Sequence, residues 1–279
     1  MKTYKIKSSD GILLHAEETG NPAGNPALFI HGYSQCRLCW KKQINSKLNK
    51  NFRLIALDIR GHGLSDKPRD AYGDSKIWAD DINAVINTLE LEQPVLVGWS
   101  YGGAIICDYL RFYGEERISG INFVGATSKI GKPAMPFMGA SCTALISGLF
   151  SNDTEESASA LHKLIESCVY KKPSPGDLYF MLGYNIIVPP YVRKSLFSRN
   201  LDNDDILSEL HRPVLLTHGA EDAIVLSNMY EHHVKVIPNT QLSIYADTGH
   251  TPFWENPERF NNELHSFLLH DDPYNLKDS

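Results

Sequence analysis

Short apolar runs alternate with segments of helical periodicity through the first half of the chain. The apolar runs have strand length, and the segments between them repeat apolar residues at helical spacing. The runs are Ala27–Ile30, Leu54–Leu57, Val95–Val97 and Ile118–Val124, and the helical segments are Leu38–Leu48, Ile77–Leu91 and Ala104–Phe112. This alternation predicts βαβ units in a mostly parallel sheet, because parallel neighbours need a crossover helix.

The two ends of the chain extend this pattern. Near the N-terminus, Tyr4–Thr19 predicts two strands joined by a turn at residues 9–11. Near the C-terminus, apolar runs at Pro213–Thr217 and Gln241–Tyr245 precede a predicted helix over Pro257–Leu269. We expect the polar residues that follow this helix to fray.

The middle of the chain, residues 127–206, breaks the alternation. It is rich in Met, Phe, Tyr and Pro, and residues 131–143 carry a single charge, at Lys132. Its mostly helical pattern predicts a lid inserted between two halves of the sheet, over the carboxyl ends of the strands, where such sheets place their sites. We therefore expect a core domain over residues 1–126 and 207–279, with a helical lid over residues 127–206. A helical packing layer without a substrate role is the alternative.

Composition and charge narrow the class of protein. Hydrophobic residues make up 42% of the chain and charged residues 22%, as in globular proteins. The net charge of −6 leaves no basic surface typical of nucleic-acid binding. No apolar run is long enough to span a membrane, and residues 1–11 lack the apolar core of a signal peptide. Five irregularly spaced cysteines argue against a disulfide framework, so we expect a cytoplasmic protein.

A candidate nucleophile stands where the run Val95–Val97 meets the next helical segment. Residues 98–102 read Gly-Trp-Ser-Tyr-Gly, a G-x-S-x-G motif centred on Ser100. A serine on such a sharp turn has its hydroxyl lifted clear of the sheet, and the glycines avoid collisions with neighbouring elements. The first amides of the following helix point toward a developing oxyanion. The motif predicts Ser100 as a nucleophile, with an ordinary glycine-rich turn as the alternative.

Two loops near the C-terminus offer the base and the acid that a serine nucleophile needs. His250 lies in a turn just after the run Gln241–Tyr245, and Asp222 directly follows the run Pro213–Thr217. The chain order Ser, Asp, His is that of the nucleophile-elbow hydrolases. Glu221, the neighbour of Asp222, is an alternative acid.

Five segments together resemble the α/β-hydrolase superfamily, and their spacing resembles the branch of aryl esterases and cofactor-free, non-haem chloroperoxidases. The segments are Phe29–Gly32, Asp58–Ser65, Gly98–Gly103, Gly219–Asp222 and Gly249–Pro252. The resemblance implies a mostly parallel, eight-stranded sheet flanked by helices, and it favours Asp222 over Glu221 as the acid. Haloalkane dehalogenases and epoxide hydrolases share the scaffold but need a carboxylate nucleophile, so the serine disfavours their reactions.

The resemblance also implies an oxyanion hole built from two backbone amides, those of Tyr33 and Tyr101. It makes His31 and His62 buried loop histidines rather than bases.

We interpret two further motifs as structural rather than as redox or metal-binding sites. The C-x-x-C segment Cys36–Cys39 would need a thioredoxin-like setting for redox chemistry. The adjacent histidines His232 and His233 point to different sides of a helix, and no zinc-ligand spacing is present, so we expect no metal.

These features together predict a carboxylesterase-like serine hydrolase that forms an acyl-enzyme and needs no cofactor. Its partner would be a small to medium apolar or aryl ester, and the protein would be a monomer or homodimer. The candidate substrate-binding residues are Trp99, Met135, Phe137, Met138, Phe180 and Met181, which fit the interior of the lid equally well. The alternatives are lactone, thioester or carbon–carbon bond hydrolysis, peracid formation, and a receptor that uses the pocket for binding alone.

Overall fold

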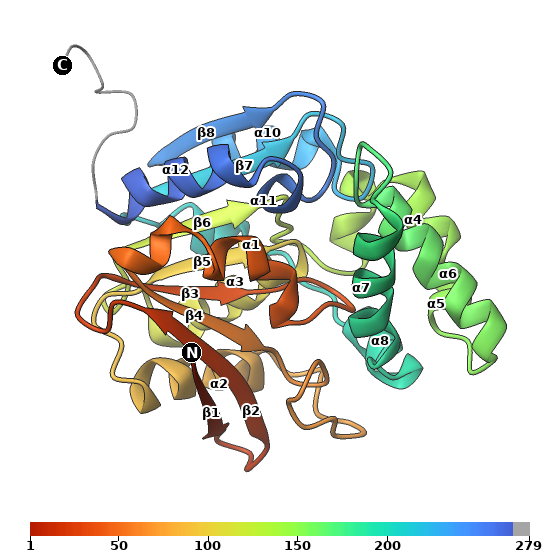
Figure 1. Ribbon diagram of the computed structural model, residues 1–279, viewed down its shortest axis with the longest axis horizontal. Coiled ribbons are helices and arrows are strands. Elements are labelled where there is room, and N and C mark those ends of the chain that lie inside the picture. The colour runs from red at the N-terminus through yellow and green to blue at the C-terminus, as the bar shows by residue number, and fades with distance from the viewer. Residues whose placement is uncertain (270–279) are drawn as a thin grey trace.

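The computed structural model describes residues 1–269, which form one eight-stranded sheet with helices on both faces (Figure 1). The strand order across the sheet is β1-β2-β4-β3-β5-β6-β7-β8. The strands are β1 (Lys2–Lys7), β2 (Leu13–Gly20), β3 (Pro26–Ile30), β4 (Arg53–Asp58), β5 (Val95–Trp99), β6 (Gly120–Val124), β7 (Val214–Gly219) and β8 (Thr240–Tyr245). The β1–β2 and β2–β4 pairs are antiparallel and the other five pairs are parallel. The predicted mostly parallel sheet of eight strands is confirmed.

The central strands are buried on both faces, and their side chains divide between two hydrophobic cores. In β3, Leu28 and Ile30 belong to one core, while Ala27 and Phe29 belong to the core on the opposite face. Successive strand residues point to opposite faces, so a strand covered on both sides is apolar at every position. The first core includes α2 (Ser75–Thr88) and α3 (Tyr101–Tyr113), and the second includes α1 (Lys41–Ile44), α11 (Pro252–Glu255) and α12 (Pro257–Leu268).

The segment predicted as helical over Leu38–Leu48 is mostly helical, but it is divided into three short helices rather than forming one. They are the 3₁₀ turn η1 (Arg37–Trp40), α1, and the 3₁₀ turn η2 (Lys47–Lys50). Ser46 separates the last two, because its hydroxyl donates to the Gln43 carbonyl at 2.7 Å and accepts from the Leu48 amide at 3.1 Å. A serine that binds nearby backbone groups in this way competes with continuation of a helix.

Residues 127–206, which we name the cap, contain most of the helices between β6 and β7. They hold η3 (Lys132–Phe137), α4 (Ala140–Ala144), α5 (Ile146–Leu149), α6 (Thr154–Ser167), α7 (Pro175–Ile186), α8 (Pro190–Leu196) and most of α9 (Asp204–Leu207). Figure 1 shows α4 to α8 gathered beyond the carboxyl ends of the parallel strands. The chain enters and leaves the cap side by side, through an antiparallel bridge between Ile130 and Leu201. The α9 helix packs against α3 of the core.

A buried ion pair fixes the returning end of the cap to the helix that follows Ser100. Arg199 donates to both carboxylate oxygens of Asp108 on α3 at 2.6 Å, and both side chains are almost fully buried. The same guanidinium donates to the Tyr101 hydroxyl at 3.2 Å, and that hydroxyl donates to the Leu196 carbonyl at 3.2 Å. Both contacts to Asp108 come from the same nitrogen, Nη2, and the charged pair holds this end of the cap against α3.

Three further predictions from the sequence concern membrane-spanning helices, disulfides and the C-terminal helix. No helix within residues 1–269 is long and apolar enough to cross a membrane. All five cysteines are buried free thiols. The predicted helix at the C-terminus is α12, and the residues predicted to fray after Leu269 lie outside the described residues.

Candidate active site

Ser100 stands on a sharp turn between β5 and α3, as the G-x-S-x-G motif predicts. Its backbone has φ 54° and ψ −118°, a region that residues other than glycine rarely adopt. A Cβ atom on Gly102 would lie 2.4 Å from the Ile30 carbonyl oxygen, and one on Gly98 would lie 2.5 Å from Ile106 Cδ1. The predicted steric need for glycine at both positions is therefore confirmed. The same close packing holds the strained backbone of Ser100 in its conformation.

Asp222 and His250 come together from two loops that follow β7 and β8. His250 Nδ1 lies 2.7 Å from Asp222 Oδ2, and both side chains are almost fully buried. The other carboxylate oxygen accepts from the amides of Ile224 at 2.8 Å and Val225 at 2.9 Å. Those two bonds fix the carboxylate, so Nδ1–H donates to Oδ2 and Nε2 remains the proton-accepting nitrogen.

Glu221, the alternative acid, faces away from this pair. Its side chain is exposed, whereas that of Asp222 is buried. The Glu221 amide donates to the Thr248 carbonyl at 3.0 Å, which fastens its backbone to the loop before His250. The geometry therefore favours Asp222 as the partner of the imidazole.

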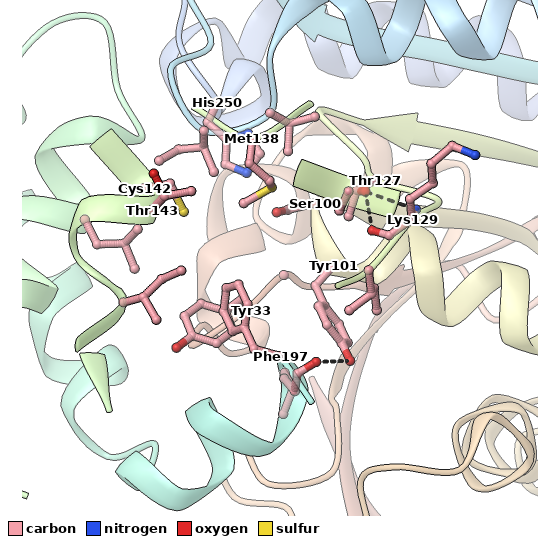
Figure 2. A pocket seen from close by; sticks show the side chains of 18 of the residues that line it. Tyr33, Ser100, Tyr101, Thr127, Lys129, Met138, Cys142, Thr143, Phe197 and His250 are labelled. Carbon is pink, nitrogen blue, oxygen red and sulfur yellow. Dashed lines mark hydrogen bonds between the residues drawn. The ribbon is translucent and has the colours of Figure 1, made fainter. Parts of the chain in front are cut away.

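Ser100 and His250 line one cavity of about 400 Å³, which lies between the sheet and the cap. Figure 2 shows the Ser100 hydroxyl and the His250 imidazole directed toward this cavity, with Tyr33, Tyr101 and Phe197 on the side away from His250. A serine hydroxyl and an imidazole held by a carboxylate can together carry out nucleophilic attack with general-base assistance.

The two predicted oxyanion-hole residues flank Ser100. Tyr101 is the first residue of α3, so its amide has no partner within the helix. Gly32 packs directly on Ser100, since a Cβ atom on Gly32 would lie 2.9 Å from Ser100 Cβ. This contact brings the Gly32–Tyr33 peptide next to the serine. The Tyr33 ring packs edge-on against Phe197 at 5.0 Å and forms part of the cavity wall.

His31 and His62 are buried loop histidines, as predicted. His31 accepts from the Ile59 amide through Nε2 at 3.2 Å and donates to the Gly32 carbonyl through Nδ1 at 2.8 Å. These bonds anchor the turn that presents Tyr33. Burial lowers the pKa of His31 to about 3 and that of His62 to about 3, so both rings are neutral.

Two residues that the sequence analysis did not single out contact the Asp222–His250 pair. His218 lies 3.5 Å from Asp222 Oδ2 through Nε2, and the same nitrogen donates to the Val225 carbonyl at 3.0 Å. Burial lowers the pKa of His218. Gly125 has φ 48°, and a Cβ atom there would lie 3.0 Å from His250 Nδ1 and 3.2 Å from Asp222 Oδ2. In the sequence, the only indication that His218 lies near this pair is its position at the end of a buried apolar run.

The structure separates the six predicted substrate-binding residues into two groups. Trp99, Met135 and Met138 line the cavity, although Trp99 also donates through Nε1 to the His250 carbonyl at 2.9 Å. The other three lie elsewhere and were predicted wrongly as part of this cavity wall. Phe137 packs on the His232 ring, Phe180 stacks on Trp254 and lies under the Lys41 ammonium, and Met181 lines a small separate pocket behind Trp99.

Most of the remaining wall comes from cap residues that sequence reasoning missed. Apart from Lys129 and Lys132, they have apolar or small side chains. They are Thr127, Lys129, Ile130, Gly131, Lys132, Ala134, Cys142, Thr143, Ile146, Leu164, Cys168, Leu196 and Phe197, with Ile224 and Val225 from the loop after β7. The i, i+4 spacing of Cys142 with Ile146 and of Leu164 with Cys168 is the available signal, but several faces of the cap helices are apolar.

The C-x-x-C segment and the adjacent histidines His232 and His233 lie in environments that fit structural roles. Burial raises the pKa of the Cys36 thiol to about 12 and also raises that of Cys39, the opposite of an activated redox pair. His232 binds the Asp204 carboxylate, whereas His233 is buried against the Ser128 hydroxyl. No group of three or more His, Cys, Asp or Glu side chains in the described part of the chain is arranged to hold a metal ion.

The chain belongs to the alpha/beta hydrolase family. The sequence profile of the alpha/beta hydrolase fold matches residues 25–257, a span that runs from the residue before β3 to the first residue of α12. It includes Ser100, Asp222, His250 and the whole cap.

Three relatives refine this assignment. The esterase RhEst1 from Rhodococcus sp. ECU1013 superposes with a TM-score of 0.92 at 35% identity, covering 96% of this chain and 99% of that one. A Burkholderia cenocepacia protein assigned as an aryl esterase gives 0.88 at 32% identity, covering 96% and 98%. The non-heme chloroperoxidase CPO-A1 of Kitasatospora aureofaciens is 26% identical, covering 93% of this chain and 97% of the relative. The predicted resemblance to this branch is confirmed, and these relatives support a hydrolase function.

Proposed function

We propose that this chain is a serine carboxylesterase that acts through an acyl-enzyme. The observation that carries the proposal is the 2.7 Å bond between His250 Nδ1 and Asp222 Oδ2, in the wall of the cavity that Ser100 also lines. A carboxylate-oriented imidazole beside a serine on a strained elbow is the constellation that acyl transfer requires.

The proposed mechanism begins with proton transfer from the Ser100 hydroxyl to His250 Nε2 as the oxygen attacks the ester carbonyl. Asp222 holds the imidazole tautomer and stabilises the imidazolium that forms. His250 then protonates the leaving alcohol, the C–O bond breaks, and an acyl-serine ester remains. Water attacks this ester with the same base assistance, which releases the acid and restores the serine.

In this proposal the backbone amides of Tyr33 and Tyr101 bind the tetrahedral oxyanion. The Gly32–Ser100 contact and the start of α3 at Tyr101 support these two donors. Each such donor contributes about 3 kcal/mol to lowering the barrier. Both are backbone groups, so their contribution does not depend on the tyrosine rings. The position of the Tyr33 amide depends on the His31 bonds that hold its turn, and that of the Tyr101 amide on the start of α3.

We propose a small to medium apolar or aryl ester as the substrate, with the cap acting as a lid over it. The cavity of about 400 Å³ suits such a ligand. Its wall on the cap side includes Ile146, Leu164, Leu196 and Phe197, whose side chains favour an apolar acyl or alcohol group.

Hydrolysis of p-nitrophenyl acetate and butyrate tests this function. We expect turnover by the wild type and a loss of at least roughly 10³-fold in Ser100→Ala. Ser147→Ala is the matched control, because Ser147 is an exposed cap serine, and it should retain activity. A fluorophosphonate should label the wild type and the control but not Ser100→Ala. Absence of both hydrolysis and labelling in the wild type would contradict the proposal, and a series of acyl lengths would then define the acyl preference.

A further inference from the structure

Glu255, the last residue of α11, binds the loop that carries His250 on both sides of the histidine. Its Oε1 atom accepts from the Gly249 amide at 2.9 Å and from the Thr251 hydroxyl at 3.1 Å. Its Oε2 atom accepts from the Tyr170 amide at 2.7 Å. One carboxylate therefore joins the two neighbours of His250 to a residue of the cap.

The cap reaches the same loop through a second contact. The His250 amide donates to the Cys168 carbonyl at 2.8 Å. The two segments also touch at Gly249, where a Cβ atom would lie 2.8 Å from the Tyr170 nitrogen and 2.9 Å from the Cys168 oxygen. Backbone hydrogen bonds and direct packing thus hold cap residues 168–170 against the His250 loop.

The donors of Gly249, Thr251 and Tyr170 require an acceptor on each carboxylate oxygen of Glu255. A glutamine side chain has the same shape but carries an NH₂ group in place of one oxygen, so one donor would face another donor. Two of the donors are backbone N–H groups, and a partly buried N–H group without an acceptor is unfavourable. Burial raises the pKa of Glu255, while the surrounding N–H and O–H donors act in the opposite direction.

We propose that Glu255 is a positioning residue that fastens the cap segment 168–170 to the His250 loop and thereby sets the position of the base. The inference rests on the proposed role of His250. Cys168 and, one helical turn earlier, Leu164 line the cavity, so an acyl group in the cavity contacts the same end of α6 that is fastened to the His250 loop. The structure thus links the substrate-facing side of the cap to the base through hydrogen bonds that do not involve Ser100.

The test compares Glu255→Gln with Glu263→Gln. Glu263 on α12 accepts from Ser243, Tyr245 and Arg259, so its substitution removes a comparable network that does not contact the His250 loop. For Glu255→Gln we expect kcat for p-nitrophenyl butyrate to fall roughly 10- to 100-fold with KM nearly unchanged, because small displacements of a catalytic group reduce kcat. The control should keep wild-type kcat.

Hydrogen exchange adds a readout that does not depend on turnover. In Glu255→Gln, peptides covering residues 166–172 and 247–252 should both exchange faster, whereas Glu263→Gln should leave both unchanged. If Glu255→Gln fails to fold, Glu255→Asp replaces it. This variant keeps the charge, draws the oxygens back by one methylene, and should lose roughly 3- to 10-fold in kcat.

The outcomes separate the two proposals. Wild-type kcat and exchange in a folded Glu255 variant would overturn the positioning role while leaving the esterase intact. Equal losses in Glu255→Gln and Glu263→Gln would also overturn it, since they would indicate a general structural effect. A wild type without hydrolysis or fluorophosphonate labelling would instead remove the proposed function on which the inference rests.

Discussion

Asp222 Oδ2 lies 2.7 Å from His250 Nδ1, whereas the neighbouring Glu221 side chain is exposed to solvent. Two adjacent acidic residues thus have opposite environments. The difference arises from the loop after β7, where the amides of Ile224 and Val225 bind Asp222 Oδ1 and turn the carboxylate inward. This relationship makes the choice of acid directly testable.

Asp222→Asn should lower kcat for p-nitrophenyl esters by roughly 10³- to 10⁴-fold, because an amide in place of Oδ2 favours the wrong imidazole tautomer. Glu221→Gln is the matched control and should stay within about twofold of the wild type. Steady-state kinetics at a fixed pH measures both variants. The opposite pattern, with activity retained in Asp222→Asn and lost in Glu221→Gln, would reverse the assignment of the acid.

Gly125→Ala should impair the same pair without removing either partner. The new methyl group would lie 3.0 Å from His250 Nδ1 and 3.2 Å from Asp222 Oδ2, at a positive φ that alanine adopts with strain. We expect kcat to fall roughly 10- to 100-fold because the imidazole must shift. Gly183→Ala, in α7 with open space around the new Cβ, is the control and should stay active. Equal activity in both variants would show that the pair tolerates the added methyl group.

The sequence was sufficient to predict the sheet and the residues that follow its strands. Ser100 and Asp222 each lie just beyond a continuous apolar run, and His250 lies in the next loop, so the parallel order of β5, β7 and β8 brings them to one edge. The pattern of apolar runs and the order of the strands along the chain are therefore enough to predict that these three residues lie at one edge of the sheet. The break between α1 and η2 within the segment Leu38–Leu48 was missed because it depends on the hydroxyl of one serine, Ser46, which binds nearby backbone groups.

The cap wall and the residues around His250 were not predictable in the same way. Phe137 and Phe180 are as apolar as Phe197, yet only Phe197 faces the cavity, because contacts between cap helices decide which face turns inward. Glu255 contacts Tyr170 across 85 positions of the chain. Such pairs depend on tertiary packing that residue periodicity does not encode.

Arg199→Met should destabilise the protein strongly. The substitution removes two bonds of 2.6 Å and leaves the Asp108 carboxylate buried without its cation. Breaking one side of a buried ion pair costs about 3–5 kcal/mol, so we expect Tm to fall by roughly 6–15 °C. Thermal denaturation followed by circular dichroism measures the change. A decrease of less than about 2 °C would mean that water replaces the lost guanidinium at Asp108.

Arg193→Met should have the opposite effect. Arg193 on α8 is 2% exposed, and within residues 1–269 the Nε and Nη1 atoms of its guanidinium have no hydrogen-bond partner, whereas Nη2 donates to the Ser157 hydroxyl at 2.8 Å. Burial lowers the pKa of Arg193, which reflects the penalty on its charged form. An apolar side chain of similar length removes that penalty, so we expect a gain of about 1–3 kcal/mol and a Tm higher by several degrees. A lower Tm would show that the cap requires this guanidinium.

Acid should destabilise the fold through its buried histidines. Burial lowers the pKa values of His31, His62 and His233 to about 3 each, whereas an unfolded histidine titrates near pH 6.5. Below pH 6.5 the unfolded chain therefore binds protons that the folded chain does not, so stability falls as the pH drops toward 3. Each histidine contributes roughly 1.4 kcal/mol per pH unit.

His233→Gln removes one of these three contributions and keeps a polar group near the Ser128 hydroxyl. We expect the free energy of unfolding to fall less steeply between pH 6 and pH 4 in this variant than in the wild type, by roughly 1.4 kcal/mol per pH unit. Urea denaturation at several pH values measures the slopes. Parallel slopes for the wild type and His233→Gln would mean that His233 becomes protonated in the folded protein.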